Sequence, residues 1–408
     1  MEGTKGNAMR RRVFVTGSAA LLLSACSSHG AGPAPVSGTA SGTASGTGGS
    51  APAPTTGPAA TASSPGPATA SPPAVGGLRV TATVATGLDV PWGLALLPDR
   101  SLLVSSRDTY EVHRIDPSTG AKTLAGTVPG VVSNEKEGGE AGLLGLALSP
   151  AYATDRTVYA YYSTDHDNRV ARFSYDPSRP AGKQLGTPEP ILTAIPLGGH
   201  HNGGRIAFGP DGLLYAGTGE AGDSALAQEK GSLGGKILRM TPDGRPPAGN
   251  PFAGSVVYSY GHRNVQGLAW DPQGRLWASE FGDREADELN LILPGRNYGW
   301  PATQGKTSNP KYTGPVAQFG TESDSPSGIA YAAGCIWMAG LKGERLWRIP
   351  LDGTRAAAAP TSFLDGDYGR LRSVVADTDG TLLLSTSNTD GRGTVRGGDD
   401  RILRVSVH

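Results

Sequence analysis

The sequence predicts an all-β fold, a six-bladed β-propeller, and three observations support this prediction. Glycine and proline are abundant, with 61 and 32 among 408 residues, and both are disfavoured inside helices. A pattern of apolar strand, Pro/Asp/Gly turn and second apolar strand occurs six times. The copies start 45 to 62 residues apart, which leaves room for four short strands in each of six blades.

Each copy of this pattern predicts a β-hairpin. In the third copy, for example, Pro-Asp-Gly at 210–212 separates an apolar run at 206–208 from a second run at 213–216. Turn residues of the Asp-Gly type between two such runs are typical of a hairpin. Two unrelated β domains that share this hairpin chemistry are the alternative. The six copies begin at Gly93, Gly145, Arg205, Gly267, Gly328 and Ser373.

Residues 1–26 have the pattern of an export signal. Three arginines at 10–12 precede an apolar run that ends at Leu23 and is too short for a stable membrane span. Leu-Ser-Ala-Cys at 23–26 resembles the lipobox of bacterial lipoproteins, in which Cys26 becomes the diacylated N-terminus. We therefore expect an exported protein, held on the outer face of the cell membrane by lipid alone. Arg-Arg-Val-Phe at 11–14 also resembles a twin-arginine signal, so export through that route or through the general secretory route stays open.

Residues 27–77 form a predicted disordered linker, because they carry no charge and consist almost wholly of Ala, Gly, Ser, Thr and Pro. The leader holds four of the 36 basic residues and one of the 36 acidic ones, so the predicted propeller domain, 78–408, keeps 32 basic and 35 acidic residues. This mildly acidic balance argues against nucleic-acid binding. Cys335 is the one thiol of the domain, which excludes an intramolecular disulfide there, and we expect it to be buried.

Polar segments bracket the repeats. Because the blades of a propeller converge on a central channel, loops from distant parts of the chain can place these segments around one site. They are Gly-His-His-Asn-Gly-Gly-Arg at 199–205, Thr-Gly-Glu at 218–220, Gly-His-Arg-Asn-Val-Gln-Gly at 261–267, Ser-Glu-Phe-Gly-Asp at 279–283, Asp-Glu at 287–288, Asn-Tyr-Gly-Trp-Pro at 297–301, Leu-Lys-Gly at 341–343 and Arg-Leu-Arg at 370–372.

From about Leu88 to the C-terminus the sequence resembles the soluble pyrroloquinoline quinone (PQQ)-dependent aldose dehydrogenases, the glucose/sorbosone dehydrogenase family. The motifs at 261–267, 287–292 and 297–301 carry the resemblance, and they are specific because they occur together and in order. The resemblance implies an enzyme that oxidises the C1 hydroxyl of an aldose to the lactone, with hydride transfer to PQQ. The particular sugar, the electron acceptor and the oligomeric state cannot be read from the sequence.

The resemblance implies catalytic roles for three residues. His201 matches the family's catalytic base, and the pKa of an imidazole suits that role. Glu220 stands nineteen residues further on, where the family has an Asp that orients the base, so the arm is one methylene longer here. Arg263 matches the residue that stabilises negative charge on the quinone oxygen.

PQQ bears three carboxylates, so its site needs several fixed cations, and arginine can hold carboxylates in bidentate fashion. Glu140 departs from this logic, because it falls where some members have a Gln that contacts PQQ. A carboxylate there would repel the anionic cofactor unless it is protonated, binds the substrate or turns away. The residues that match the family's PQQ contacts are Glu140, Arg263, Asn264, Leu341, Lys342, Gly343, Arg370, Leu371 and Arg372.

Ca²⁺ is the second cofactor that the resemblance implies. The backbone carbonyls of Gly282 and Asp283 match ligands of a Ca²⁺ that also binds PQQ and polarises the quinone carbonyl. A further, structural Ca²⁺ would use the Glu288 carboxylate and the Tyr298 carbonyl. A solvated acidic loop is the alternative for this segment.

Two other functions compete with the sugar dehydrogenase. A calcium-dependent propeller lactonase needs carboxylates around a central metal and no cationic cluster, so Lys342, Arg370 and Arg372 argue against it. A propeller without cofactor could bind carbohydrate or protein at the cell surface. Uptake of PQQ by the purified protein separates this binding module from the enzyme.

Overall fold

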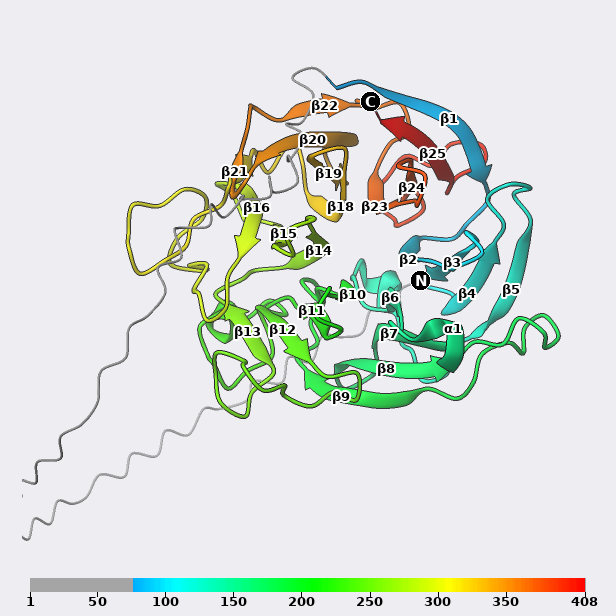
Figure 1. The fold of residues 1–408 in the computed structure, drawn as a ribbon, viewed down its shortest axis with the longest axis horizontal. Coiled ribbons are helices and arrows are strands. Elements are labelled where there is room, and N and C mark those ends of the chain that lie inside the picture. The colour runs from blue at the N-terminus through cyan, green and yellow to red at the C-terminus, as the bar shows by residue number, and fades with distance from the viewer. Residues whose placement is uncertain (1–75, 408) are drawn as a thin grey trace, which may run out of the picture. The chain divides into compact units, whose positions relative to one another are not determined.

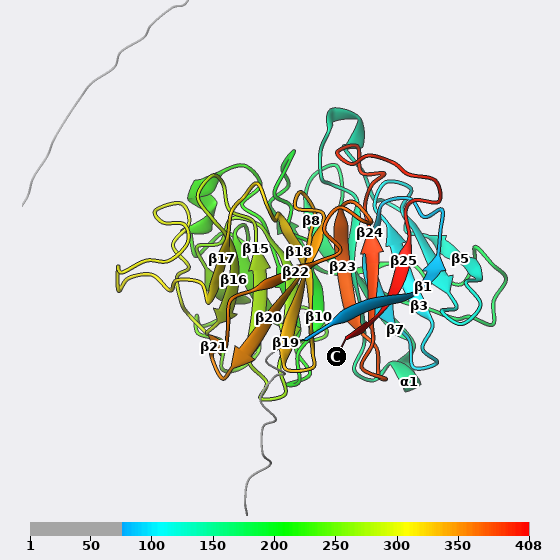
Figure 2. The ribbon, with the colours of Figure 1, turned by 90° about the horizontal axis from the view of Figure 1, so that it is seen from above.

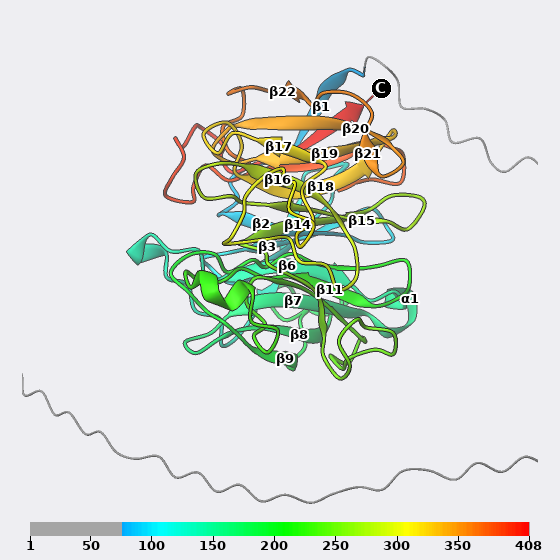
Figure 3. The same ribbon diagram turned by 90° about the vertical axis from the view of Figure 1, so that its left-hand side faces the viewer.

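The computed structural model describes residues 76–407, and these residues form a six-bladed β-propeller, as predicted (Figure 1). The predicted leader with Cys26 and the predicted linker up to residue 75 lie outside the described residues. Figure 1 shows six antiparallel sheets arranged around a central axis, and Figures 2 and 3 show the same sheets from the side.

Each blade is one sheet whose strands follow one another outward from the axis. Blade 1 contains β2 (Pro91–Leu96), β3 (Leu102–Ser106), β4 (Glu111–Ile115) and β5 (Lys122–Thr127). Blade 2 contains β6 (Leu143–Leu148), β7 (Thr157–Ser163), β8 (Asn168–Ser174) and β9 (Glu189–Ile195). Blade 3 contains β10 (Ile206–Phe208), β11 (Leu214–Gly217), β12 (Lys236–Met240) and β13 (Val257–Tyr260).

The second half of the ring repeats this arrangement. Blade 4 contains β14 (Val265–Trp270), β15 (Leu276–Glu280), β16 (Asp287–Ile292) and β17 (Ala317–Phe319). Blade 5 contains β18 (Pro326–Ala332), β19 (Cys335–Gly340), β20 (Arg345–Asp352), β21 (Arg355–Ala356) and β22 (Thr361–Phe363), of which the last two both pair with β20. Blade 6 contains β23 (Leu371–Ala376), β24 (Leu382–Thr386), β25 (Ile402–Val407) and β1 (Leu78–Ala85).

The helices of the described chain are short. They are the 3₁₀ helices η1 (Glu135–Glu137) and η2 (Ser224–Ala227) and the α-helix α1 (Tyr152–Asp155). None of the helices in residues 76–407 has the length and hydropathy needed to cross a bilayer.

The six repeated segments become the innermost strands β2, β6, β10, β14, β18 and β23, and each contacts the next around the ring. Glycines of the repeat permit this close approach. A Cβ atom on Gly93 would lie 2.6 Å from the carbonyl oxygen of Leu144 in the next blade, and one on Gly145 would overlap the carbonyl oxygen of Gly204. The glycines that begin four of the six repeats therefore allow neighbouring blades to approach closely at the axis.

The two ends of the described chain close the ring in one sheet. β1 pairs antiparallel with β25, with Leu78 opposite Val407 and Ala85 opposite Ile402. The outer edge of blade 6 is thus supplied by the N-terminal strand (Figure 1). The repeat pattern did not predict this pairing, because β1 lies before the first copy.

Apolar side chains of neighbouring blades pack into shared cores. Trp337 of blade 5 and Leu384 of blade 6 belong to one buried cluster, and Trp277 of blade 4 and Ile336 of blade 5 belong to another. Cys335 is buried among them with a free thiol, as predicted.

Gly93→Ala is expected to destabilise the protein by about 1–3 kcal/mol, because backbone atoms of the next blade leave no room for a methyl group. Gly231→Ala is the matched control, since a Cβ at Gly231 meets no atom within 4 Å. Urea unfolding of both variants measures the difference. Equal stability of the two variants would contradict the role given to the repeat glycines.

Candidate active site

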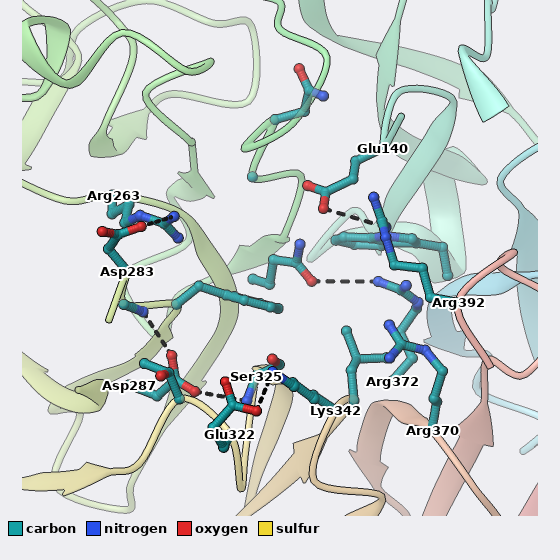
Figure 4. Close-up of a pocket in the computed structure, with 18 of the residues that line it drawn as sticks. Glu140, Arg263, Asp283, Asp287, Glu322, Ser325, Lys342, Arg370, Arg372 and Arg392 are labelled. Atoms are coloured by element: carbon teal, nitrogen blue, oxygen red, sulfur yellow. Dashed lines mark hydrogen bonds and ion pairs between the residues drawn. The ribbon is translucent and has the colours of Figure 1, made fainter. Parts of the chain in front are cut away.

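A cavity of about 450 Å³ lies at the end of the ring where the innermost strands begin and the second strands end (Figure 4). All six blades, or the loops that join them, contribute to its wall. The cavity brings together residues that are far apart in the sequence, and eight of the predicted site residues line it: Glu140, Arg263, Gly282, Asp283, Leu341, Lys342, Arg370 and Arg372.

His201 and Glu220 do not line the cavity themselves, but they form a hydrogen-bonded pair beside it: Asn202, the next residue, and Glu140, which accepts the His201 N–H, are both lining residues. His201 Nδ1 lies 2.7 Å from Glu220 Oε1. The Glu220 side chain is buried and its Oε2 has no hydrogen-bond partner within the described residues, whereas the imidazole is partly exposed. With Nδ1 held by the carboxylate, Nε2 is the ring nitrogen left for a substrate.

The backbone around His201 is tightly specified. His201 has a left-handed conformation with φ 59°, its N–H donates to Glu140 Oε2 at 3.0 Å, and its carbonyl accepts the N–H of Ala221. A Cβ on Gly219 would overlap the His201 carbonyl oxygen, so only glycine allows these two segments to lie together. The segment Thr-Gly-Glu thus serves both to bring Glu220 to the imidazole and to accommodate the turn at His201.

Glu140 does not stand as an isolated carboxylate. It accepts the His201 N–H, and its other oxygen lies 3.5 Å from Arg392 Nη1 (Figure 4). Arg392 therefore places a positive charge beside the Glu140 carboxylate, and the sequence analysis did not predict this ion pair.

Arg370 and Arg372 share a single buried carboxylate. Asp390 Oδ2 lies 2.9 Å from Arg370 Nε and 3.2 Å from Arg372 Nη2. Burial lowers the pKa of Arg372 to about 10, with the neighbouring Asp390 acting in the opposite direction. Because two guanidinium groups face one carboxylate, this side of the cavity keeps a net positive charge.

Arg263 and Lys342 bring further cations to the cavity wall. Arg263 Nη2 lies 3.2 Å from Asp283 Oδ1, and its guanidinium lies over the Trp300 ring at 5.4 Å. Within the described residues Arg263 Nε is buried and has no hydrogen-bond partner. Lys342 is half-exposed and pairs with Glu322 at 2.6 Å.

Several predicted residues flank the cavity without lining it. Asn264 is buried, and its side-chain oxygen accepts the N–H of Gly203, which ties blade 4 to the turn before blade 3. The Leu371 side chain packs in the core of blade 6, so only its backbone is available at the site. The carbonyl of Gly343 accepts a hydrogen bond from Arg345 Nε.

The predicted calcium ligands lie in two places. Gly282 and Asp283 line the cavity, and the Gly282 N–H donates to Asp287, a lining residue whose pKa burial raises. Glu288 lies apart from the cavity, where its carboxylate accepts hydrogen bonds from Gly305 N–H and Asn290. Burial, followed by the nearby Glu280 carboxylate, raises the pKa of Glu288 to about 8.

Tyr298 also lies outside the cavity, and its ring stacks on His262 at 4.6 Å. No cluster of three or more His, Cys, Asp or Glu side chains with the arrangement of a metal site occurs in residues 76–407.

A second histidine–carboxylate pair, His262 and Glu280, fixes the backbone at Arg263. His262 is fully buried, with Nδ1 2.7 Å from Glu280 Oε2 and Nε2 2.8 Å from Ser259 Oγ. The other oxygen of Glu280 accepts the Arg263 N–H. Glu280 thereby holds the Gly-His-Arg-Asn segment in place.

Sequence reasoning missed Arg107, Asp390 and Arg392. Arg107 lines the cavity and is buried against Asp108 at 2.7 Å. Arg107 directly follows β3, the second strand of blade 1. The segment 218–220 directly follows β11, the second strand of blade 3, so this equivalent position in the repeat could have identified Arg107. Asp390 and Arg392 lie in a glycine-rich loop outside every repeat and had no such signal.

Comparison with known proteins finds relatives that are named as sugar dehydrogenases. A PQQ-bound aldose sugar dehydrogenase from Streptomyces coelicolor is 61% identical, with a TM-score of 0.81 over 83% of this chain and 100% of that one. An aldose sugar dehydrogenase of Escherichia coli is 31% identical over 74% of this chain and 89% of its own length. Quinoprotein glucose dehydrogenase B of Acinetobacter calcoaceticus is 30% identical over 62% of this chain, and the match spans 59% of that protein.

The family described as glucose/sorbosone dehydrogenase matches residues 88–402, which include all of blades 1 to 5 and the two inner strands of blade 6. The protein therefore belongs to the glucose/sorbosone dehydrogenase family.

Proposed function

We propose that the protein is a PQQ- and calcium-dependent dehydrogenase that oxidises the C1 hydroxyl of an aldose to the lactone. The observation that carries this proposal is the His201–Glu220 pair beside a cavity with fixed, buried arginines. The names of the relatives support the same class, since one of them is an aldose sugar dehydrogenase with PQQ bound.

The residues around the cavity fit a polyanionic cofactor. Arg370 and Arg372 share one carboxylate, and the lowered pKa of Arg372 indicates a buried positive charge that a further anion would stabilise. The unpartnered Nε of Arg263 offers one more buried donor. We assign the carboxylates of PQQ to Lys342, Arg370 and Arg372, with Arg263 beside the quinone. PQQ, when bound, would supply the acceptor for the hydride.

The protein's own residues would manage the proton and the developing charge. His201 Nε2 takes the proton of the C1 hydroxyl while the hydride leaves C1, so the sugar loses two electrons and two hydrogen nuclei and becomes the lactone. Glu220 fixes the ring through Nδ1 and stabilises the imidazolium. Arg263 stabilises negative charge that develops on the acceptor side.

Calcium would be held by the carbonyl oxygens of Gly282 and Asp283 at the cavity wall, a donor set of the kind that Ca²⁺ prefers. A second ion at Glu288 and Tyr298 would compensate a buried carboxylate that otherwise has a raised pKa. Equal activity and equal thermal stability with Ca²⁺ and after chelation would remove calcium from the proposal.

The location remains part of the proposal. The leader, with the lipobox-like Leu-Ser-Ala-Cys at 23–26, supports export of the protein and its attachment to the membrane through Cys26. The enzyme would pass its electrons to a separate acceptor. Labelled palmitate that is incorporated equally by the natural chain and by Cys26→Ser would contradict the anchor.

His201→Ala is expected to lower kcat for dye-linked oxidation of monosaccharides by about 10²- to 10⁴-fold, while PQQ still binds, because the variant lacks only the base. The protein reconstituted with PQQ and Ca²⁺ is assayed with a set of aldoses. The adjacent, exposed His200→Ala serves as the control and should retain activity. A fully active His201→Ala enzyme would overturn the assignment.

Arg372→Ala is expected to weaken PQQ binding by about 10- to 100-fold, since it removes a buried charge-assisted partner. Titration followed by the quinone absorbance measures the affinity, with the exposed Arg355→Ala as the control. If neither variant nor the natural chain takes up PQQ, the cofactor-free binding module becomes the better explanation.

A further inference from the structure

The loop between β24 and β25, residues 387–401, reaches two parts of the active site at once. Its Asp390 is the shared counterion of Arg370 and Arg372. Two residues later, Arg392 lines the cavity and contacts the segment before blade 2 (Figure 4). In Figure 2 this loop stands beyond the strand ends, beside the segment that carries η1.

Arg392 makes two contacts with that segment. Its Nη2 donates to the carbonyl of Gly138 at 2.7 Å, and its Nη1 lies 3.5 Å from Glu140 Oε1. The contact with Gly138 joins residues 254 positions apart in the chain. Because a backbone carbonyl and a carboxylate hold the same guanidinium, its position is fixed more firmly than by an exposed ion pair alone.

Glu140 in turn holds the backbone at His201. Its carboxylate accepts the His201 N–H at 3.0 Å, and its own N–H donates to the carbonyl of Gly199. His201 has a left-handed backbone, which is unfavourable for a residue with a Cβ and persists only where neighbours hold it. The carboxylate of Glu140 is one of the groups that hold it.

We propose that Glu140 and Arg392 are positioning residues: they fix the backbone of His201, and they connect it through one loop to the arginines on the far side of the cavity. This inference rests on the proposed function for its catalytic consequence, but the contacts themselves are independent of any cofactor. In this proposal Glu140 acts on the backbone of His201 and not on the cofactor, which is the contact that the family resemblance implies. Arg392 is the counterion of the Glu140 carboxylate and offsets its repulsion of an anionic ligand in the cavity.

The connection also makes a prediction about coupling. Asp390 and Arg392 share a short loop, so a ligand that draws Arg370 and Arg372 toward itself acts on the same loop that steadies Glu140. Occupation of the cavity by PQQ is therefore expected to change the amide-exchange protection of residues 196–204 relative to the cofactor-free protein.

The test compares Glu140→Ala, Glu140→Gln and Arg392→Gln with Arg396→Gln. Arg396 lies in the same loop but donates to the carbonyls of Gly366 and Asp367, away from the cavity, so it is the matched control. Amide hydrogen exchange of residues 196–204 is measured without cofactor. PQQ affinity and kcat are then measured on the reconstituted proteins.

Glu140→Ala should speed exchange at the His201 amide at least tenfold and lower kcat about 10- to 100-fold, with less than a threefold change in PQQ affinity, because a small displacement of the base is costly. Glu140→Gln keeps an oxygen that can accept the His201 N–H and should restore most of both. Arg392→Gln should fall between them, and Arg396→Gln should match the natural protein.

Unchanged exchange in Glu140→Ala would overturn the inference, as would a loss of activity explained wholly by lost PQQ binding. If the natural protein itself oxidises no sugar, the proposed function fails. The exchange measurement then still decides whether Glu140 and Arg392 hold His201.

Discussion

The close approach of six innermost strands around one axis is the constraint on which the rest of the structure depends. Glycines at 93, 145, 267 and 328 leave room for the neighbouring backbone, whereas the third repeat starts with Arg205. Arg205 Nη2 donates to Ser373 Oγ at 2.8 Å, its Nε donates to the carbonyl of Gln266, and its guanidinium lies 4.4 Å from the Trp92 ring. One buried cation thus ties four blades together, and burial lowers its pKa to about 9. Two of its partners, Trp92 and Gln266, line the cavity.

The active site is assembled from loops that are each held by a nearby carboxylate. Glu220 holds His201, Glu280 holds the Arg263 backbone, and Asp390 holds Arg370 and Arg372. The side chains held in this way are therefore ordered before a ligand binds, which lowers the entropic cost of binding and catalysis. The acidic composition of the domain and its cationic cavity are compatible, because many of the acids serve as these local supports.

The sequence was sufficient for the fold, because the repeated Gly-Leu-Ala and Asp-Gly patterns have direct physical causes in blade packing and hairpin turns. Arg263 and Lys342, which the resemblance to the glucose/sorbosone dehydrogenases implies as cofactor contacts, do line the cavity. It was insufficient for contacts between distant loops: nothing in the local pattern indicates that Arg392 reaches Glu140 or that β1 pairs with β25. The role of Glu140 also depends on the direction of its side chain, which the sequence pattern does not determine in an irregular segment between two blades.

The pairing of β1 with β25 has a consequence for how the protein reaches its native state. Leu78 and Val407 are neighbours in the sheet but stand at opposite ends of the domain, so their contact requires closure of nearly the whole chain. Loop closure on this scale is a slow, late event in folding, and it can take place only after the last strand has left the ribosome. An incomplete chain would keep an open strand edge on blade 6, where pairing with another chain becomes possible. Completion of the ring is thus also the step that protects the newly made protein from self-association.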